Sequence, residues 1–374
     1  MIYDVIIVGS GSVGAAAGCY ATINNLNVLM IDAHHPPHHH GSHHGKTRLI
    51  RYAYAEGDQY LPLLQRSKVL WEALEKTTGT SLLTPCGVLS LAPVDSPLIP
   101  TLIECAKTWS VDVEPLSASE IMQRWATFVV PENYHGVLDK NAGYLYSEKA
   151  VEQWIRLAQE QGCAQLFNCS VNEISHYDDL YRVSTADGEY TARKIIVTAG
   201  SWVKKLHPNI PISPVRKVMT WFQSDGRFSQ HANFPAFTAQ LTDGSQYYGF
   251  PAEDDQLKVA RHDGGQPLND AAECLPFGQY PTDGSECFSF LKQFLPGQSA
   301  CLYGLACSYD NSPDGHFIID YLDNDKTGLI ISGLSGHGFK CAPALGEIAS
   351  QFALGNEVDT VIEPFRLKRF EKNC

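Results

Sequence analysis

The sequence has little positive charge. Its 374 residues include 28 lysines and arginines against 41 aspartates and glutamates, which gives a formal net charge of -13. Because binding to nucleic-acid phosphates requires a basic face, this balance excludes nucleic acid as an expected partner. A negatively charged substrate would need a local positive pocket set against the overall field.

Cysteine pairs and long apolar runs are also missing. The 11 cysteines form no CxxC pair and no zinc-type spacing, and a disulfide scaffold is not expected in a chain of this length. No apolar run approaches the roughly 20 residues that a membrane helix needs. The apolar N-terminus lacks the basic segment of a signal peptide. We therefore predict a cytoplasmic protein, in a reducing compartment, without a membrane segment.

The chain opens with a strand–helix–strand pattern. Residues 3–9 are apolar and largely β-branched, which predicts a buried parallel strand, and residues 27–32 predict a second one. Between them, residues 10–25 are rich in small side chains and predict a helix, which completes a βαβ unit of about 30 residues. Further along the chain, 149–162 predicts a helix, 193–200 and 327–338 predict strands, and 339–355, which begins with Phe339 and Lys340, predicts a helix.

Three glycines follow the first predicted strand directly. Gly9, Gly11 and Gly14 form GxGxxG, and Asp32 ends the second strand. These glycines suit a tight turn, a close backbone approach to a pyrophosphate and close packing of helix on strand. The helix N-terminus supplies positive potential to the pyrophosphate, and Asp32 can accept hydrogen bonds from ribose hydroxyls. The pattern predicts dinucleotide binding; the alternative is a glycine turn without a ligand.

Two later strand-to-glycine junctions bear on which dinucleotide is bound. The segment VTAG ends at Gly200, and SGLSGHG contains Gly336 and Gly338. FAD is long, and distant segments of the chain must close over its ring end, whereas a nicotinamide dehydrogenase does not require this arrangement. The junctions favour FAD and leave a nicotinamide cofactor as the alternative.

The middle of the chain has a different character. Residues 214–309 alternate apolar and polar side chains between turn signals such as TDGS and HDGG, which indicates antiparallel strands. The predicted fold class is α/β plus a β-rich second domain. A discontinuous Rossmann-like FAD-binding domain, of the glutathione-reductase type, contains an inserted substrate domain with a mixed or antiparallel sheet. The predicted FAD-binding segments are 1–84, 147–217 and 320–374, and the predicted substrate-domain segments are 85–146 and 218–319.

Histidines concentrate just after Asp32. Seven of the 14 lie between His34 and His44, which suggests a metal site as one interpretation. Pro36 and Pro37 split the run and force an extended loop, and no frame of carboxylates or cysteines accompanies it. We interpret the run from His34 to His40 as loop surface and predict no metal. A non-enzymatic metal-binding protein is the alternative from a different class.

Four segments together resemble one family. They are GSHHGKTRLIR (41–51), YYGFP (247–251), CSYDNSPD (307–314) and GLSGHGFK (333–340). In this order they are similar to segments of the monomeric sarcosine oxidase family, whose members are FAD-dependent oxidases of N-methyl amino acids. The resemblance extends over essentially the whole chain, and it implies an enzyme that acts as a monomer on a small molecule.

The resemblance implies a set of residues that hold FAD. Cys307 matches the cysteine that this family joins to the 8α-methyl of the flavin as a thioether, and a thiolate is a suitable nucleophile for that position. The N-terminus of the last predicted helix is implied to face the flavin, where its dipole stabilises negative charge. The full implied set is Gly9, Ser10, Gly11, Gly14, Asp32, His43, His44, Arg48, Gly200, Cys307, Gly336, Gly338 and Lys340.

The resemblance also implies residues that act on substrate and oxygen. Arg51 and Lys340 match the pair that binds the substrate carboxylate, one as a bidentate fork and one as a point charge. Lys258 matches the lysine that promotes reaction of the reduced flavin with oxygen, because a fixed cation stabilises superoxide. His262 and Tyr248 match residues beside the substrate, and Lys258 and His262 are expected on one face of a strand. The alternative is that these side chains are exposed on an edge strand.

The implied reaction is oxidative demethylation of an N-methyl-L-amino acid. Oxygen and water are consumed, and the products are the primary amino acid, formaldehyde and hydrogen peroxide. Thr238 stands where the sarcosine oxidases of this family carry methionine, so there is more room beside the amine, and N-methyl-L-tryptophan is the preferred substrate. The alternatives are sarcosine or another secondary amine, and a flavin dehydrogenase with a different electron acceptor.

Overall fold

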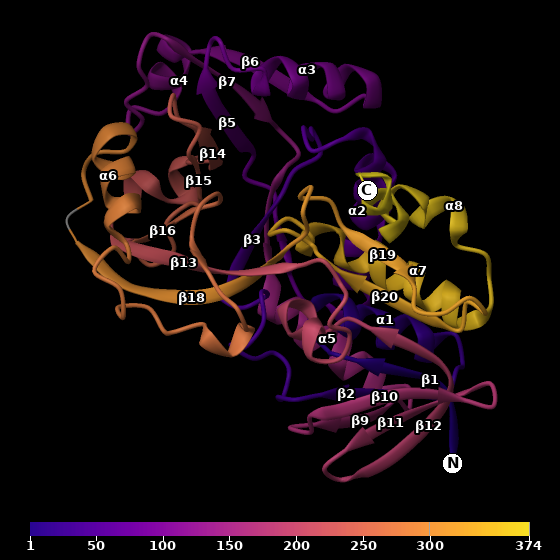
Figure 1. Cartoon of the computed structure of the whole chain (residues 1–374). Helices are drawn as coiled ribbons and strands as arrows, with labels where there is room; N and C mark the ends of the chain where they lie inside the picture. The colour runs from indigo at the N-terminus through magenta and orange to yellow at the C-terminus, as the bar shows by residue number, and fades with distance from the viewer. Residues whose placement is uncertain (299, 374) are drawn as a thin grey trace.

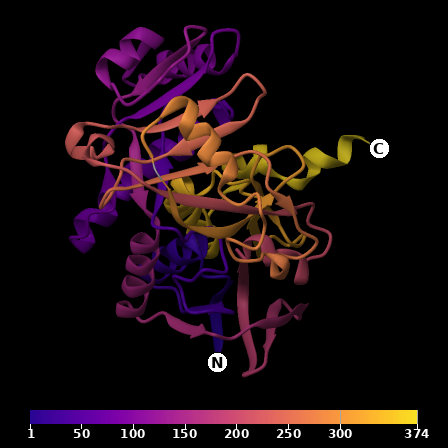
Figure 2. The same cartoon turned by 90° about the vertical axis from the view of Figure 1, so that its left-hand side faces the viewer.

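The computed structural model describes residues 1–298 and 300–373. Within these residues the strands form an eight-stranded sheet, a nine-stranded sheet and a three-stranded sheet. Two views at right angles show the eight-stranded sheet at the end of the molecule where the N-terminus lies, and the nine-stranded sheet toward the opposite end (Figures 1 and 2). The chain passes between the two large sheets several times.

The eight-stranded sheet is built around a parallel centre, in which β1 pairs with β2 and β12, β2 with β9, and β12 with β20. In spatial order its strands are β10 (Val171–Tyr177), β11 (Leu180–Thr185), β12 (Gly188–Val197), β1 (Ile2–Val8), β2 (Val28–Asp32) and β9 (Ala164–Phe167), with β20 (Gly328–Ser332) beside β12 and β19 (Ile318–Tyr321) beside β20. The strands β10, β11 and β19 pair antiparallel with their neighbours.

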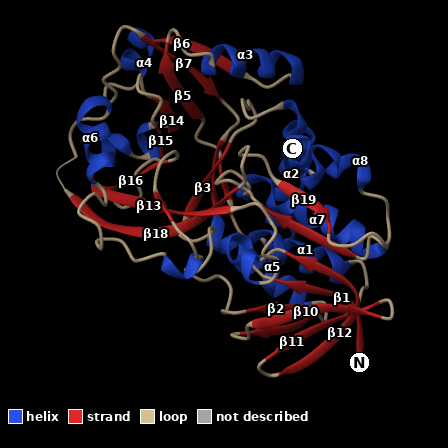
Figure 3. Ribbon diagram, in the orientation of Figure 1, coloured by secondary structure: helices blue, strands red, loops and turns tan. Residues whose placement is uncertain are grey.

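The central strands are apolar at every position because both faces of the sheet are covered. Val5 and Ile7 of β1 belong to a large cluster that includes residues from three helices near the sheet and from further helices, whereas Ile6 and Val8 pack into a separate cluster on the other face. Figure 3 shows α1 and α5 lying together beside this sheet. The three helices are α1 (Ser12–Ile23), α5 (Ser147–Glu160) and α7 (Ala342–Leu354).

The nine-stranded sheet is antiparallel except where β14 pairs in parallel with β5. In spatial order its strands are β17 (Gln266–Pro267), β13 (Ser213–Gln223), β16 (Gln256–Arg261), β15 (Gln246–Gly249), β14 (Ala236–Gln240), β5 (Val88–Pro93), β7 (Tyr134–Asp139) and β6 (Val113–Ser117), and β18 (Cys301–Asn311) pairs with β13. Three helices pack on this sheet: α3 (Leu98–Trp109), α4 (Ala118–Arg124) and α6 (Ser285–Phe294).

The small sheet lies where the two large parts of the molecule meet (Figure 1). It consists of β3 (Thr47–Ile50), β8 (Gly143–Tyr146) and β4 (Leu83–Thr84), with β8 in the middle. Strand β3 carries Arg48, and Arg51 follows it directly, so this sheet fixes the backbone of both arginines. The remaining helices are α2 (Leu61–Thr78) and α8 (Asp359–Ile362).

The predicted fold class is confirmed: a Rossmann-like α/β part is joined to a second part with a mixed sheet. The assignment of residues to two domains stays a prediction, and β13 runs from Ser213 to Gln223 across one of its borders. One detail differs from expectation. Lys340 lies in a short 3-10 turn, Phe339–Cys341, that precedes α7, and the strand predicted at 327–338 ends at Ser332. None of the helices described here is long and apolar enough to span a bilayer.

Candidate active site

The turn between β1 and α1 requires glycine at two positions and leaves a third one open. Gly9 has a φ of +92°, and a Cβ there would lie 2.6 Å from the carbonyl oxygen of Thr198. A Cβ at Gly14 would lie 1.8 Å from the carbonyl oxygen of Gly9, so strand and helix pack backbone to backbone. At Gly11 a Cβ would meet His43 Nδ1 at an ordinary 3.6 Å. Gly11 therefore leaves the N-terminus of α1 accessible to a ligand.

A cavity of about 460 Å³ begins at this turn. Its walls come from distant parts of the chain, which include the β1–α1 turn, residues 31–34, the loop 40–43, residues 198–202, Tyr309 with Asp310, and the segment around Gly336 and Gly338. The predicted cofactor residues that line it are Gly9, Gly11, Asp32, His43, Arg48, Gly200, Gly336 and Gly338. A site assembled in this way suits a long ligand that extends from the β1–α1 turn to the nine-stranded sheet.

Asp32 is held as an acceptor at the edge of this cavity. The backbone N–H groups of Ser10 and His34 donate to its carboxylate at 2.6 and 2.9 Å, and His38 Nε2 lies 3.2 Å from it. Burial alone would raise the pKa of Asp32, but the contact with His38 and the two backbone donors lower it. The carboxylate is therefore ionised at neutral pH. Ser10 contributes its backbone N–H to this arrangement.

The loop before β3 carries two buried histidines and Arg48. Burial lowers the pKa of His43 and of His44 to about 3, so both rings are neutral. Arg48 donates to the carbonyl oxygens of Ser42 and His44 at 2.6 Å each, and to that of Thr47 at 2.7 Å. The ring nitrogens of His44 have no hydrogen-bond partner among the described residues. These contacts fix the loop, which places the Arg48 cation and the neutral ring of His43 at the wall of the cavity.

Cys307 lies on β18, directly opposite Lys217 of β13. It is buried in a small cluster with Met219, Trp221 and Tyr309, and only Tyr309 of these residues lines the cavity. Burial raises the pKa of the Cys307 thiol, while nearby Arg48 and Lys217 act to lower it. The thiol therefore sits behind the cavity wall, close to cations that would favour its thiolate.

A second cavity, of about 310 Å³, adjoins the first. Arg48, Tyr309, Gly336 and Phe339 line both cavities, so they form the shared wall. The other predicted residues on the second cavity are Arg51, Thr238, Tyr248, His262 and Lys340. All the residues predicted to contact the substrate are therefore together in one cavity, next to the one that suits the cofactor.

Three cationic side chains, those of Arg48, Arg51 and Lys340, and one carboxylate, that of Glu56, line the second cavity. Arg51 Nη2 donates to Glu56 Oε1 at 2.7 Å, and Lys340 Nζ donates to the carbonyl oxygen of His337 at 2.7 Å. Burial would raise the pKa of Glu56, but Arg51 and Lys340 lower it to about 2. Burial, together with the charge of Arg51, lowers the pKa of Lys340 to about 8. The pocket thus concentrates positive charge in a protein whose net charge is negative.

Neutral polar side chains and apolar ones line the rest of the second cavity. Burial lowers the pKa of His262 to about 4 and raises that of Tyr248 to about 12, so neither is charged near neutral pH. Tyr248 lies opposite Thr238 in the β14–β15 pair, and Thr238 Oγ1 donates to Ser90 Oγ at 3.0 Å. His262 follows the end of β16 and donates its backbone N–H to Gln246 at 2.7 Å.

Lys258 lies outside both large cavities. It lines a pocket of about 10 Å³, and its Nζ donates to the carbonyl oxygens of Gly45 and Thr47 at 2.6 and 2.9 Å and to Thr47 Oγ1 at 3.2 Å. Leu257 and Val259 pack under α6 on the opposite face of β16. Burial lowers the pKa of Lys258 well below its usual value. Three oxygen acceptors match the three N–H bonds of an ammonium group.

The histidine run forms an irregular loop, and His35, His39 and His40 are exposed. The rings of His34 and His40 stack at 3.7 Å. In the part of the chain that the structure describes, no group of three or more histidine, cysteine, aspartate or glutamate side chains is arranged to hold a metal. The loop interpretation agrees with these contacts.

Several residues of the site were not predicted. Glu56 lies five residues after Arg51, in a segment with no recognisable pattern, and its pairing appears only in the folded chain. His337 and Tyr309 lie inside segments that carry the family resemblance but had no role assigned to them. Tyr54, which contacts both His337 and Lys340, has no local signal in the sequence.

The residues of the first cavity fit FAD. The glycine turn provides a cradle for a pyrophosphate, Asp32 provides an acceptor for ribose, and Arg48 places a cation where the first cavity meets the second. In agreement, residues 4–352 match the family described as FAD dependent oxidoreductase.

The chain is also similar to proteins of known activity over its whole length. It is 55% identical over 372 residues to an N-methyl-L-tryptophan oxidase of Escherichia coli (strain SMS-3-5 / SECEC), with 99% of this chain and 100% of the relative covered. An N-methyl-L-tryptophan oxidase of Escherichia coli O1:K1 / APEC is 54% identical with the same coverage.

Solved structures share the fold. NikD, an amino acid oxidase of nikkomycin biosynthesis, superposes with a TM-score of 0.86 at 21% identity, covering 97% of each chain. The L-proline dehydrogenase of P. horikoshii superposes with a TM-score of 0.82 at 19% identity, covering 99% of this chain and 98% of that one. Fold and site together define a flavoprotein oxidoreductase, and the chain belongs to the FAD-dependent oxidoreductase family. The predicted flavin-dependent amine oxidase is confirmed at this level.

Proposed function

We propose that the enzyme demethylates an N-methyl-L-amino acid, with N-methyl-L-tryptophan as the best substrate. Oxygen and water are consumed, and L-tryptophan, formaldehyde and hydrogen peroxide are released. The observation that carries this proposal is the full-length similarity to the two Escherichia coli relatives, at 55% and 54% identity. The geometry of the second cavity supplies residues for each part of such a substrate.

The carboxylate of the substrate binds between Arg51 and Lys340. Both line the second cavity, and a substrate carboxylate that reaches Arg51 competes with Glu56 for its guanidinium group. The two positive charges also favour the deprotonated form of the substrate amine, which is the form that can be oxidised. Binding at this point orients the amine toward the wall that the two cavities share.

The side chain of the substrate occupies the part of the cavity near Thr238. Leu98, Thr238 and Tyr247 line this pocket, which at about 310 Å³ falls within the range of roughly 300–1,000 Å³ typical of small-molecule sites. The neutral ring of His262 and the neutral hydroxyl of Tyr248 can exchange hydrogen bonds with the substrate without adding charge. These features support a substrate larger than N-methylglycine.

FAD would be held by the β1–α1 turn, Asp32 and Arg48, and covalently by Cys307 through a thioether to the 8α-methyl. When bound, FAD supplies the oxidation, because it accepts a hydride equivalent from the N-methyl carbon and returns the electrons to oxygen. The nearby cations of Arg48 and Lys217, which favour the thiolate form of Cys307, support the attachment. The resemblance to covalently flavinylated oxidases supports it independently.

Lys258 promotes the reaction with oxygen. Its ammonium is fixed by Gly45 and Thr47, in the loop that leads to Arg48. Lys258→Met removes the charge and retains much of the side-chain volume. We therefore expect it to slow reoxidation of the reduced enzyme by oxygen, measured by stopped-flow absorbance, while anaerobic reduction by substrate stays within about threefold of wild type. Equal reoxidation rates in the two proteins would contradict this role.

We also propose that the enzyme acts as a monomer in the cytoplasm. The ten cysteines that the structure describes are free, which supports a reducing compartment. The family resemblance supports the monomer.

The reaction is tested by product stoichiometry. Purified enzyme is incubated with N-methyl-L-tryptophan, and oxygen consumption, formaldehyde and hydrogen peroxide are measured together. We expect equal molar amounts of the three, and none with L-tryptophan, which has no N-methyl carbon to oxidise. Formaldehyde formed only with an artificial electron acceptor would instead indicate a dehydrogenase.

A further inference from the structure

A chain of hydrogen bonds leads from a surface loop to Lys340. His337 Nε2 lies 3.0 Å from the carbonyl oxygen of Gly315, His337 Nδ1 lies 2.7 Å from Tyr54 OH, and Lys340 Nζ lies 3.3 Å from the same hydroxyl oxygen. These three side chains are all buried. Tyr54 and His337 are 283 residues apart in sequence, so the contact exists only in the folded chain.

The direction of each hydrogen bond in this chain is fixed. The Gly315 oxygen can only accept, so His337 carries its proton on Nε2. Burial lowers the pKa of His337 to about 3, so the ring is neutral and its Nδ1 can only accept. Tyr54 must then donate its hydroxyl proton to His337. The lone pairs of the Tyr54 oxygen remain to accept a hydrogen bond from Lys340.

This arrangement leaves Lys340 with one N–H group for the substrate. An ammonium group has three N–H donors. One donates to the carbonyl oxygen of His337 at 2.7 Å and one to Tyr54. Because Lys340 lines the second cavity, the third is available to a ligand there. An acceptor on a buried ammonium also favours the charged form over the neutral amine.

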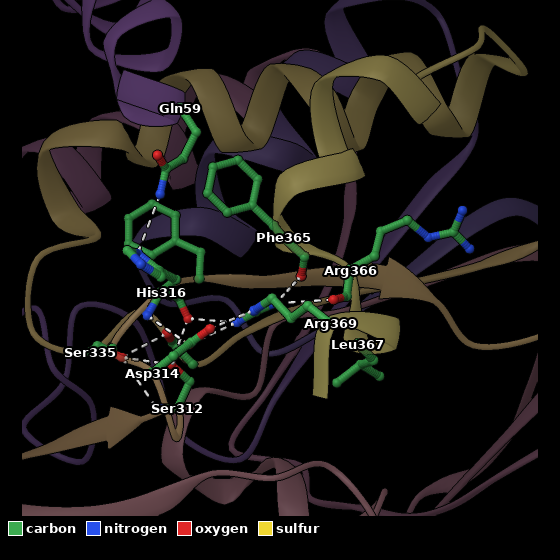
Figure 4. Close-up of polar contacts among 12 residues, drawn as sticks. Gln59, Ser312, Asp314, His316, Ser335, Phe365, Arg366, Leu367 and Arg369 are labelled. Carbon is green, nitrogen blue, oxygen red and sulfur yellow. Dashed lines mark hydrogen bonds and ion pairs between the residues drawn. The ribbon is translucent and has the colours of Figure 1, made fainter. Parts of the chain in front are cut away.

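The C-terminal segment of the protein anchors the Gly315 end of this series of hydrogen bonds (Figure 4). Arg369 Nε and Nη2 donate to the Asp314 carboxylate at 2.8 and 3.1 Å, and Nη2 donates to the carbonyl oxygen of His316 at 3.1 Å. These bonds hold the turn on both sides of Gly315. Ser312 and Ser335 join this turn to the loop that carries His337, because the Ser312 N–H donates to Ser335 Oγ at 3.1 Å.

We propose that Tyr54 and His337 are positioning residues for Lys340. They form an oriented hydrogen-bond relay, named here the His337–Tyr54 relay, that fixes the Lys340 ammonium for a substrate carboxylate. The inference rests on the proposed function, in which Lys340 binds that carboxylate. The charged and titratable groups that face Lys340 are Arg51, Tyr54, Glu56, His262, His337 and Cys341.

The test measures binding of an amine-free carboxylate, indole-3-propionate, to the holoenzyme. Flavin absorbance reports the Kd from pH 6 to 10, a range in which this ligand does not titrate. The pKa of Lys340, lowered to about 8, predicts tight binding below that pH and weaker binding above it, because the ammonium loses its proton as the pH rises. The wild-type curve of Kd against pH gives the midpoint with which the midpoints of the variants are compared.

Tyr54→Phe removes the acceptor and retains the ring. We expect the Kd at pH 7 to rise about 2- to 10-fold, the range for loss of one hydrogen bond, and the midpoint to move to lower pH. His337→Ala should act in the same direction. His337→Asn, which keeps an acceptor near the position of Nδ1, should restore much of the affinity. Tyr60→Phe is the control, since the Tyr60 hydroxyl contacts His316 and Phe317 but not Lys340.

Two outcomes separate the relay from the proposed function. If Lys340→Met weakens binding while Tyr54→Phe and His337→Ala keep the wild-type Kd and midpoint, the relay is wrong and the carboxylate site stands. If Lys340→Met binds as wild type does, the carboxylate site itself is wrong. A loss of affinity in Tyr54→Phe with an unchanged midpoint would also overturn the relay, because it would indicate a structural role alone.

Discussion

Arg51 shows why a single side chain decides the chemistry of the second cavity. Its guanidinium group already binds a carboxylate, that of Glu56, at 2.7 Å. That contact uses one of its N–H groups, and its Nε has no partner among the described residues. The planar fork of arginine can make two parallel hydrogen bonds to an amino acid carboxylate, whereas lysine acts as a point charge.

Arg51→Lys is therefore expected to raise KM for the amino acid roughly 10- to 100-fold, which corresponds to losing about 1.5–3 kcal/mol of charge-assisted hydrogen bonding. The value of kcat should change little, because the lost contact is present in both the ground state and the transition state. Arg66→Lys is the matched control: Arg66 pairs with Glu347 on the surface. An unchanged KM in Arg51→Lys would contradict the assignment.

Cys307 carries the proposed covalent link. Acid-precipitated wild-type protein should stay yellow and fluorescent, and precipitated Cys307→Ser protein should be colourless with flavin released to the supernatant. Cys287→Ser provides the control, because Cys287 is also buried but lies on α6, in a different cluster of the core. Retained flavin colour in precipitated Cys307→Ser protein would rule out this attachment site.

At the scale of elements, glycine serves two purposes in the β1–α1 turn: Gly14 allows the helix to pack closely on the strand, and Gly11 leaves space for a ligand. Gly14→Ala puts a Cβ against the carbonyl oxygen of Gly9, where nothing flexible can move aside. We expect a strongly destabilised protein with a lowered Tm. Gly11→Ala has space within the protein, so Tm of the flavin-free protein should hold while FAD affinity falls. Thermal unfolding of the two flavin-free proteins checks this, and equal losses of stability would contradict it.

Local patterns predicted the elements better than the contacts between them. The βαβ unit and its glycine turn follow from neighbouring residues, because apolar strands and a GxGxxG turn form from adjacent segments. The contact of Tyr54 with His337 depends on how the segment after β3 and the loop after β20 meet, and the ion pair of Arg51 with Glu56 depends on the irregular path of the chain between them. Lys258 illustrates the same limit: its strand face followed from the alternation, but its contact with Gly45 did not.

At the scale of the whole molecule, the two large sheets have separate tasks. The eight-stranded sheet presents strand ends to the cofactor cavity, and the nine-stranded sheet presents Tyr248, Thr238 and the end of β16 to the substrate cavity. The three-stranded sheet between them fixes Arg48 at the shared wall and Arg51 at the second cavity. The eight-stranded sheet therefore shapes the glycine-turn end of the cofactor cavity, and the nine-stranded sheet shapes the substrate cavity and carries Lys258 and Cys307.

The most direct test compares kcat/KM for N-methyl-L-tryptophan and sarcosine by hydrogen peroxide formation, under air and at one pH. The volume beside Thr238 predicts that N-methyl-L-tryptophan is preferred by at least about tenfold, since even one well-placed methylene group changes discrimination by roughly 10- to 200-fold. An equal or higher kcat/KM for sarcosine, or no peroxide from N-methyl-L-tryptophan, would contradict the proposed function.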